Sequence, residues 1–267
     1  MNQEILQILR EQKEMNLPGG LYHKVQVIFA YHTNRMEGSQ LTEEQTRSMF
    51  ETHTILSDNA VLNIDDIIET QNHFRAFDFM LEHAKEDLSM DLIKQFHAIL
   101  KRGTSDERKS WFKVGDFKAL PNEVGGRETV APENVEQELR KLLESYHALS
   151  AVKVEDIIDF HAKFESIHPF QDGNGRVGRL IMFKECLKYG IMPFIIDEQH
   201  KAFYDRGLQK YPGEKGYLMD TCLSAQDTFT AIYQYFNGPW RSKQFRAANR
   251  GTPHFETDRP QYRPPFR

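Results

Sequence analysis

Apolar residues recur at helical spacing along most of this 267-residue chain, and that periodicity restricts the fold more than any other feature. Between Asn63 and Leu81, one helical face collects Ile64, Ile67, Ile68, Phe74, Phe77, Met80 and Leu81. Comparable patterns predict helices over residues 21–36, 42–54, 89–103, 132–146, 154–167, 176–189, 197–211 and 215–236. Thr42, Asn63 and Ser89 stand where N-caps are expected. The fold class is therefore predicted to be all-α.

One segment interrupts the helical pattern. Residues 114–130 carry short apolar islands separated by Gly115, Pro121, Gly125 and Gly126. Glycine and proline at such intervals favour turns over helix, so a small β-hairpin flap is expected here.

The stretch from His168 to Arg179 concentrates a histidine, a carboxylate, two amides, three glycines and two arginines in twelve residues. Because glycine reaches backbone angles that strain other residues, Gly173 and Gly175 are expected to form a nest of N–H groups. An apolar run follows at once and predicts a helix, whose N-terminal end also favours phosphate. The order predicts a polyphosphate-binding loop.

The side chains of this loop indicate hydroxyl attack on a phosphate. The unperturbed pKa of histidine lies near working pH, so His168 is the candidate general base, and Asp172 offers the hard oxygen ligand that Mg²⁺ prefers. Arg176 and Arg179 lie one turn apart and can grip phosphate oxygens, while the Asn174 amide can donate to another.

These twelve residues resemble the signature of the Fic family, His-Pro-Phe-x-(Asp/Glu)-Gly-Asn-Gly-Arg-x-x-Arg, at every fixed position. The resemblance implies a mainly helical protein that transfers AMP from ATP to a Ser, Thr or Tyr hydroxyl of a target protein, and to itself. It makes His168 the base and Asp172 the ligand of Mg²⁺ (or Mn²⁺). The phosphates of ATP would meet, from α to γ, Asn174 with the backbone of Gly173 and Gly175, then Arg176, then Arg179.

Two further parts of the chain resemble the family less specifically. Asn122, Glu123, Val124 and Gly125 stand where Fic proteins place a hairpin that pins the target segment by strand addition. Tyr204 and Leu208 fall where the adenine pocket is expected, although packing in the core explains both residues equally well.

Residues 33–38, Thr-Asn-Arg-Met-Glu-Gly, resemble the Fic inhibitory pattern (Ser/Thr)-x-x-x-Glu-(Gly/Asn) of class II members. The resemblance assigns regulatory roles to Thr33 and Glu37. At the end of its helix, Glu37 can pair with Arg179 and so occupy the partner of the γ-phosphate. The chain departs from the commonest pattern at Ser39, where relatives often carry Asn.

The chain divides into N-terminal helices (1–62), a Fic core (63–237) and a basic, proline-rich tail (238–267) that is expected to be disordered. A net charge of −5 argues against a general nucleic-acid binder. No apolar run is long enough to span a membrane. Cys186 and Cys222 are expected to be buried free thiols, which indicates a cytoplasmic protein. The histidines lack zinc spacing and are expected to be structural.

Two alternatives remain open. The chain can be a metal-dependent hydrolase that removes AMP from proteins, with Glu37 catalytic, because some Fic proteins run in that direction. It can also be a non-enzymatic nucleotide-sensing module, although the intact base His168 argues against this. Because relatives with an inhibitory helix often dimerise, the resemblance also allows a homodimer.

Overall fold

The computed structural model describes residues 3–55 and 61–237, and within them helix is the predominant secondary structure. The helices are α1 (Gln3–Glu14), α2 (Leu21–Met36), α3 (Glu43–Thr52), α4 (Ile64–Glu82), α5 (Met90–Lys101), α6 (Val135–His147), α7 (Val154–Ile167), α8 (Asn174–Tyr189), α9 (Lys201–Lys210) and α10 (Gly216–Asn237). Short 3₁₀ turns, η1 (Ser105–Arg108), η2 (Pro132–Asn134) and η3 (Glu198–His200), complete the helical part. The predicted fold class, all-α with a small hairpin, is confirmed.

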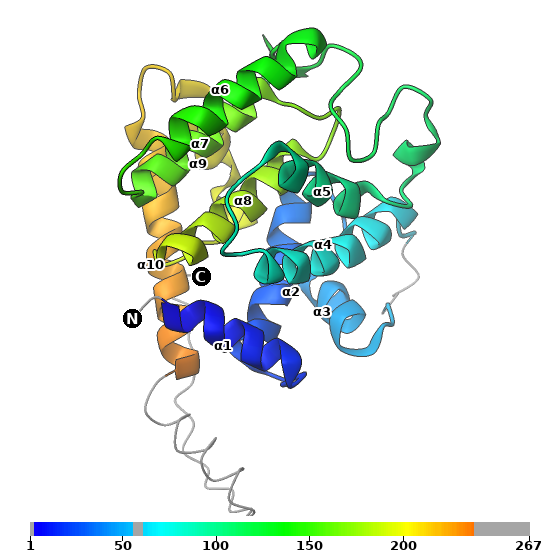
Figure 1. The fold of residues 1–267 in the computed structure, drawn as a ribbon. Helices are drawn as coiled ribbons and strands as arrows, with labels where there is room; N and C mark the ends of the chain where they lie inside the picture. The colour runs from blue at the N-terminus through cyan, green and yellow to red at the C-terminus, as the bar shows by residue number, and fades with distance from the viewer. Residues whose placement is uncertain (1–2, 56–60, 238–267) are drawn as a thin grey trace, which may run out of the picture.

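Helix α8 forms the centre of the molecule, where it contacts α7, α5, α4 and α2 (Figure 1). Its Phe183 is fully buried and its ring packs against Phe29 of α2, Phe77 of α4 and Phe229 of α10. Aromatic packing of this kind fixes the axis of α8, because each ring fills a large volume that its neighbours must match. The loop that precedes α8 is therefore held on a rigid support.

Side chains at the predicted caps end the helices as expected. Thr42 accepts from the backbone of Gln45, whose side chain accepts from Thr42 N–H, which makes a complete capping box. Asn63 and Ser89 accept from backbone N–H groups at the starts of α4 and α5. Helix α8 begins at Asn174, two residues before the predicted start.

Helix α1 lies outside the set of helices predicted from the sequence. Its Ile5, Leu6 and Leu9 are at most 3% exposed and join the main core. The spacing of these three residues is the helical signal.

The predicted flap is a hairpin of two short antiparallel strands, β1 (Glu123–Val124) and β2 (Arg127–Glu128). Gly125 and Gly126 form its turn with φ angles of 58° and 75°. Two consecutive positive φ angles are what a tight hairpin turn requires, and glycine reaches them without strain.

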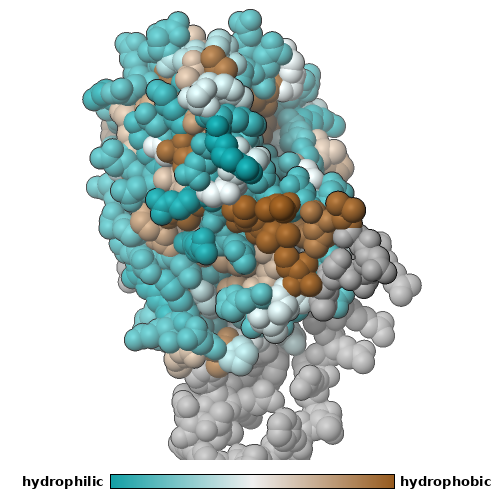
Figure 2. Space-filling model, turned by 90° about the vertical axis from the view of Figure 1, so that its right-hand side faces the viewer, coloured by the Kyte–Doolittle hydropathy of each residue, from teal (hydrophilic) through white to brown (hydrophobic). Residues whose placement is uncertain are grey.

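Cys186 and Cys222 are buried free thiols, as predicted. Exposed apolar side chains lie before and at the start of α4, where Val61 is 100% and Ile64 70% exposed. Figure 2, which views the side that carries the α3–α4 connection, shows a broad hydrophobic area there. No helix among the described residues is long and apolar enough to cross a membrane. The tail predicted to be disordered, 238–267, lies outside the described residues.

Candidate active site

A cavity of about 640 Å³ opens between the C-terminal end of α2, the loop before α8, the flap and α9. Eight of its twenty lining residues were predicted from the sequence: Glu37, Val124, Gly125, His168, Gly175, Arg179, Tyr204 and Leu208. Residues separated by up to 171 positions, Glu37 to Leu208, thus meet around one volume of the size that nucleotides and similar ligands occupy.

His168 ends α7 in the left-handed conformation, with φ 51° and ψ 63°. A residue with a Cβ pays for this conformation, and such positions cluster at functional sites. Its Nδ1 lies 3.7 Å from Glu165 Oε2, so Nε2 is the nitrogen that faces the cavity. Burial, followed by the nearby charge of Lys118, lowers the pKa of His168 to about 4. His168 is therefore neutral at physiological pH and can accept a proton.

The loop before α8 is held in shape by its own side chains. Asn174 is 1% exposed; its Oδ1 accepts from Phe170 N–H and its Nδ2 donates to Phe170 O, both at 2.8 Å. The Phe170 ring, also buried, stacks on His97 at 4.0 Å. The Asn174 amide, which is predicted to meet a phosphate, closes the loop in the structure, and its contact with a phosphate stays a prediction. The first N–H groups of α8 remain the donors that a helix start offers to an anion.

The two loop glycines serve different purposes. Gly173 has φ 82°, as a nest-forming glycine should. Gly175 lies inside α8 without a positive φ, so the prediction that it needs glycine's backbone freedom is wrong. A Cβ at Gly175 would overlap Glu37 Oε1 and lie 2.9 Å from Arg179 Nη1. Gly175 is needed because the Glu37–Arg179 pair passes directly over it.

Glu37, the C-cap residue of α2, accepts from Arg179 Nη2 at 2.5 Å. Arg179 is 4% exposed and also donates to Thr33, through Nε to Oγ1 at 2.5 Å and through Nη2 to the backbone oxygen at 3.2 Å. Burial alone would raise the pKa of Glu37, but the charges of Arg179 and Arg176 hold it below the usual range. The predicted regulatory residues therefore do contact the predicted γ-phosphate arginine, as an ionised pair.

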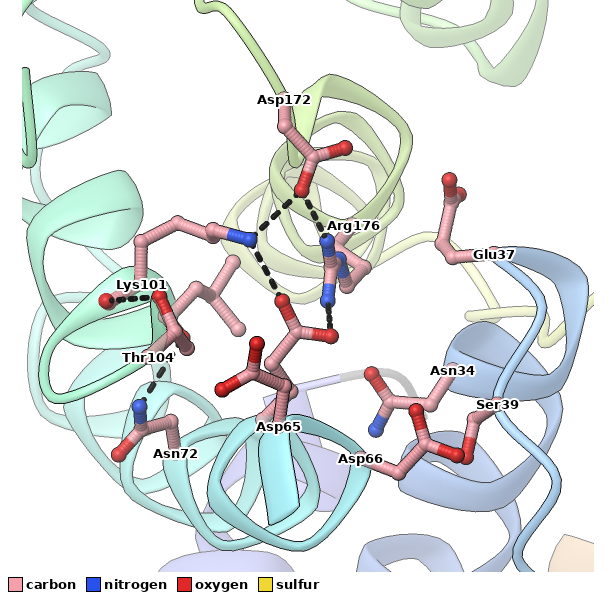
Figure 3. A network of polar contacts seen from close by, with 12 residues as sticks. Asn34, Glu37, Ser39, Asp65, Asp66, Asn72, Lys101, Thr104, Asp172 and Arg176 are labelled. Atoms are coloured by element: carbon pink, nitrogen blue, oxygen red, sulfur yellow. Dashed lines mark hydrogen bonds and ion pairs between the residues drawn. The ribbon is translucent and has the colours of Figure 1, made fainter. Parts of the chain in front are cut away.

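Asp172 and Arg176 belong to a buried charge network beside the cavity (Figure 3). Arg176, 2% exposed, pairs with Glu69 and, at 2.8 Å, with Asp172 Oδ2. Lys101 Nζ lies 2.7 Å from the same Oδ2. Burial would raise the pKa of Asp172, but Arg176 and Lys101 hold it well below its ordinary value. The predicted metal ligand is thus ionised at neutral pH.

The flap is anchored to the loop before α8. Backbone Lys118 N–H donates to Pro169 O at 2.9 Å, and Asn122 Nδ2 donates to Phe170 O at 3.0 Å. Asn122 thereby supports the flap, whereas Val124 and Gly125 line the cavity. Glu123, in β1, is exposed. Of the predicted docking residues, Asn122 therefore anchors the flap, and Val124 and Gly125 border the cavity.

Tyr204 and Leu208 both line the cavity from α9, which favours the pocket interpretation for Leu208. Tyr204 is only 2% exposed and its hydroxyl lies 2.6 Å from His161 Nε2. The Arg179 guanidinium lies 5.9 Å from the centre of the Tyr204 ring, within the range of a cation–π contact. Tyr204 is therefore both a packed core residue and part of the cavity lining.

Sequence reasoning missed Glu165, a buried carboxyl at the cavity floor. Its Oε1 has no hydrogen-bond partner among the described residues. A Cβ at Gly178 would lie 2.9 Å from this oxygen and 2.7 Å from the His161 ring, so the glycine makes room for both. Burial raises the pKa of Glu165 to about 8. The signal in the sequence was its position three residues before His168, on the same helical face.

We expect Glu165→Gln to change how stability depends on pH. The folded protein keeps a proton on Glu165 up to about pH 8, whereas the unfolded chain releases it near pH 4.5. The folded state binds the extra proton in this window, so Glu165 lowers stability as pH rises through it. Relative to the parent, the Gln variant should gain about 1.4 kcal/mol per pH unit across the window.

Urea unfolding at several pH values between 5 and 8.5 measures this difference. Glu144→Gln, at an exposed position of α6, is the matched control and should leave the pH dependence unchanged. Parallel pH curves for the parent and Glu165→Gln would show that Glu165 is not buried as a proton-bearing group.

The comparisons with known proteins identify this arrangement. The model of the Fic/DOC family matches residues 87–186, which include the complete loop and most of α8. This segment is therefore similar to the Fic domains of that family. The match begins before α5 and ends inside α8, so the elements that hold His97, Lys101, His168 and Asp172 all lie within it.

Curated relatives match a wider part of the chain. "Protein adenylyltransferase Fic" of Drosophila ananassae is 29% identical over 177 residues, which are 65% of this chain and 34% of that protein. "Protein adenylyltransferase fic-1" of Caenorhabditis elegans is 25% identical over 181 residues, 66% of this chain and 35% of that protein. The chain thus spans about a third of the length of these relatives.

Solved structures share the fold of the Fic domain and its surrounding helices. A Fic-domain signalling protein from Bacteroides thetaiotaomicron superposes with a TM-score of 0.68 at 20% identity, covering 88% of this chain and 95% of that one. Fic-1 of C. elegans superposes with a TM-score of 0.68 at 22% identity, covering 90% and 73%. The likeness extends beyond the family match to most of the described helices.

Proposed function

We propose that this Fic domain transfers AMP from ATP to a hydroxyl side chain of a target protein, and to itself. The observation that carries the proposal is the common cavity of His168, Arg179 and the start of α8, bordered by the flap. A base, an anion-binding helix end and a cationic side chain meet there. The names of the curated relatives, protein adenylyltransferases, support the same activity.

The reaction assigns a task to each group. The target hydroxyl oxygen attacks the α-phosphorus while its proton passes to His168 Nε2. The bond from the α-phosphorus to the oxygen bridging the β-phosphate breaks, and pyrophosphate leaves. The N–H groups at the start of α8 and the guanidinium of Arg179 offset the charge of the phosphates. Strand addition at Val124 and Gly125 would hold the target beside His168.

The residues present also fit the Mg²⁺ (or Mn²⁺) that accompanies ATP. Asp172 is ionised, and both of its ion pairs use the same oxygen, Oδ2. A carboxylate of this kind holds a hard divalent cation, which would neutralise phosphate charge.

The pair of Glu37 with Arg179 supports autoinhibition of the transferase. Arg179 cannot give its fork to both Glu37 and a γ-phosphate, and Glu37 adds a negative charge to the place that a triphosphate needs. Thr33 binds the remaining edge of the guanidinium and keeps it turned toward α2. The resting protein is therefore proposed to be held at low activity by its own α2.

The activity is tested by incubating the protein with ATP labelled at the α-phosphate and Mg²⁺. Label should appear on the protein itself, on target proteins, or on both. A homodimer and a cytoplasmic location stay predictions of the sequence. If the chain dimerises, the exposed apolar side chains of Val61 and Ile64 are candidates for the contact surface.

The pH dependence of transfer is expected to lack the usual histidine inflection. Because the pKa of His168 is lowered to about 4, the base is already free of its proton at pH 5.5. Transfer by the Glu37→Gly variant should therefore be flat between about pH 5.5 and 7.5, whereas an unshifted histidine titrates near 6.5. Initial rates across this range measure it.

Lys118→Met supplies the control for the cause of that shift. Removing the Lys118 charge should raise the pKa of His168, so the loss of activity in acid should begin at higher pH. An inflection near pH 6.5 in the variant that keeps Lys118 would contradict the proposed burial of the base.

A further inference from the structure

Lys101, the last residue of α5, places a buried ammonium among three carboxylates. Its side chain is 2% exposed, and Nζ lies 2.6 Å from Glu69 Oε1, 2.6 Å from Asp106 Oδ2 and 2.7 Å from Asp172 Oδ2. The carboxylates come from α4, η1 and the loop before α8. One cation therefore ties three separate elements together.

Without this lysine, the three carboxylates would resemble a metal site. Ligand oxygens of Glu69, Asp106 and Asp172 all lie within 4.8 Å of one another, a spacing that fits a divalent cation. A metal ion needs its oxygen ligands at about 2.0–2.6 Å, and the ammonium already fills the space between them. The Lys101 side chain also packs under Gly173 and reaches the face of Phe112, 5.5 Å from its ring centre.

A second cation closes the arrangement into a ring. Arg176 pairs with Glu69 through Nη1 and with Asp172 through Nη2, while Lys101 pairs with the same two carboxylates. Both cations hold Oδ2 of Asp172. Figure 3 shows Lys101 and Arg176 directed at this oxygen, with the second carboxylate oxygen of Asp172 turned away from them.

We propose that the Lys101 ammonium is a built-in cation that positions Asp172 for the divalent ion. By holding Oδ2, Lys101 keeps Asp172 in one orientation and leaves the second oxygen to meet the ion that arrives with ATP. Glu69 and Asp106 serve Lys101 and are not ligands of that ion. The proposal rests on the proposed function, which assigns Asp172 to the divalent ion.

The two possible uses of the carboxylates predict opposite results for Asp106→Asn. If Lys101 fills the group, Asp106 never contacts a divalent ion, and binding of Mn²⁺ should stay within about twofold of the parent. If the three carboxylates themselves form the metal site, loss of one charged ligand should weaken Mn²⁺ binding about tenfold or more. Asp172→Asn should abolish Mn²⁺ binding in either case, and this loss shows that the measured signal comes from Mn²⁺ at Asp172.

Removing the ammonium should create the site that it occupies. In Lys101→Met, the three carboxylates lose the buried cation that they share, and we expect Mn²⁺ to bind at least about tenfold more tightly than to the parent. Lys101→Arg keeps the charge and should bind Mn²⁺ as the parent does. Lys184→Met is the matched control, because Lys184 is 0% exposed and pairs with Glu185 away from the cavity.

The measurement is a titration with Mn²⁺ alone, followed by electron paramagnetic resonance, in the absence of nucleotide and target. It is therefore independent of transfer activity, and a chain that transfers no AMP still gives a clear answer. Unchanged binding in Asp106→Asn together with tighter binding in Lys101→Met supports the proposal. Weaker binding in Asp106→Asn, or a Lys101→Met variant that folds and binds Mn²⁺ no better than the parent, overturns it. If Lys101→Met does not fold, Asp106→Asn alone decides.

Discussion

Replacing Glu37 by glycine is expected to raise the rate of AMP transfer by about 10- to 100-fold, because a hydrogen bond between charged groups contributes roughly 1.5–3 kcal/mol. The substitution frees Arg179 Nη2, which Glu37 holds at 2.5 Å, and removes a negative charge from the lining of the cavity. Glu37 is the C-cap residue of α2 and precedes Gly38, which already has φ 102°. Glycine there adds little backbone strain.

The assay compares the parent and Glu37→Gly with labelled ATP and Mg²⁺, at equal protein concentration. Glu198→Gly is the matched control, because Glu198 also ties α2 to another element, through Arg35 at 3.0 Å and Tyr31 at 2.8 Å. If activation came merely from loosening α2, both variants would be active. If it comes from releasing Arg179, only Glu37→Gly is.

Two results would count against this form of autoinhibition. Equal labelling by the parent and Glu37→Gly would show that the Glu37–Arg179 pair does not limit the reaction. Release of AMP from a modified protein by the parent, abolished in Glu37→Gly, would instead make Glu37 a catalytic residue of a hydrolase.

Much of the local structure could be predicted from the sequence, since its causes are local. The capping box at Thr42 and the cap at Ser89 involve residues three positions apart, and the glycine pair at 125–126 permits the hairpin turn by itself. The loop before α8 carried enough residue types in one stretch to indicate phosphate chemistry. The pairing of Glu37 with Arg179 came from the family resemblance and not from periodicity.

What the sequence left out depends on contacts between distant segments. Lys101 and Asp172 are 71 positions apart, and no pattern in the sequence around either residue predicts their contact. The sequence suggested that Gly175 was needed for its backbone angles. In the structure a side chain at this position would collide with Glu37, which ends another helix. The Asn174 amide looked available to a ligand until the fold brought Phe170 against it. In each case, the surroundings of a recognised residue decided its task.

Replacing His168 by alanine in the Glu37→Gly background is expected to lower transfer by about 100- to 10,000-fold, the usual contribution of a general base. His168 is the histidine that lines the cavity, and its lowered pKa keeps it ready to accept the hydroxyl proton. Binding of a fluorescent ATP analogue should be nearly unchanged, because the contacts to phosphates come from α8 and Arg179. Single-turnover rates and fluorescence titrations separate the two effects.

His147→Ala, at an exposed position near the end of α6, is the matched control and should keep full activity. The split between binding and rate carries the argument. A base acts only on the proton that moves in the transition state, so its loss lowers the rate and spares the affinity. If His168→Ala lost both the transfer rate and the affinity for nucleotide, His168 would instead serve to shape the loop through its left-handed backbone conformation. Undiminished transfer would remove His168 from the chemistry, and nucleotide binding without turnover in every variant would favour a sensor over an enzyme.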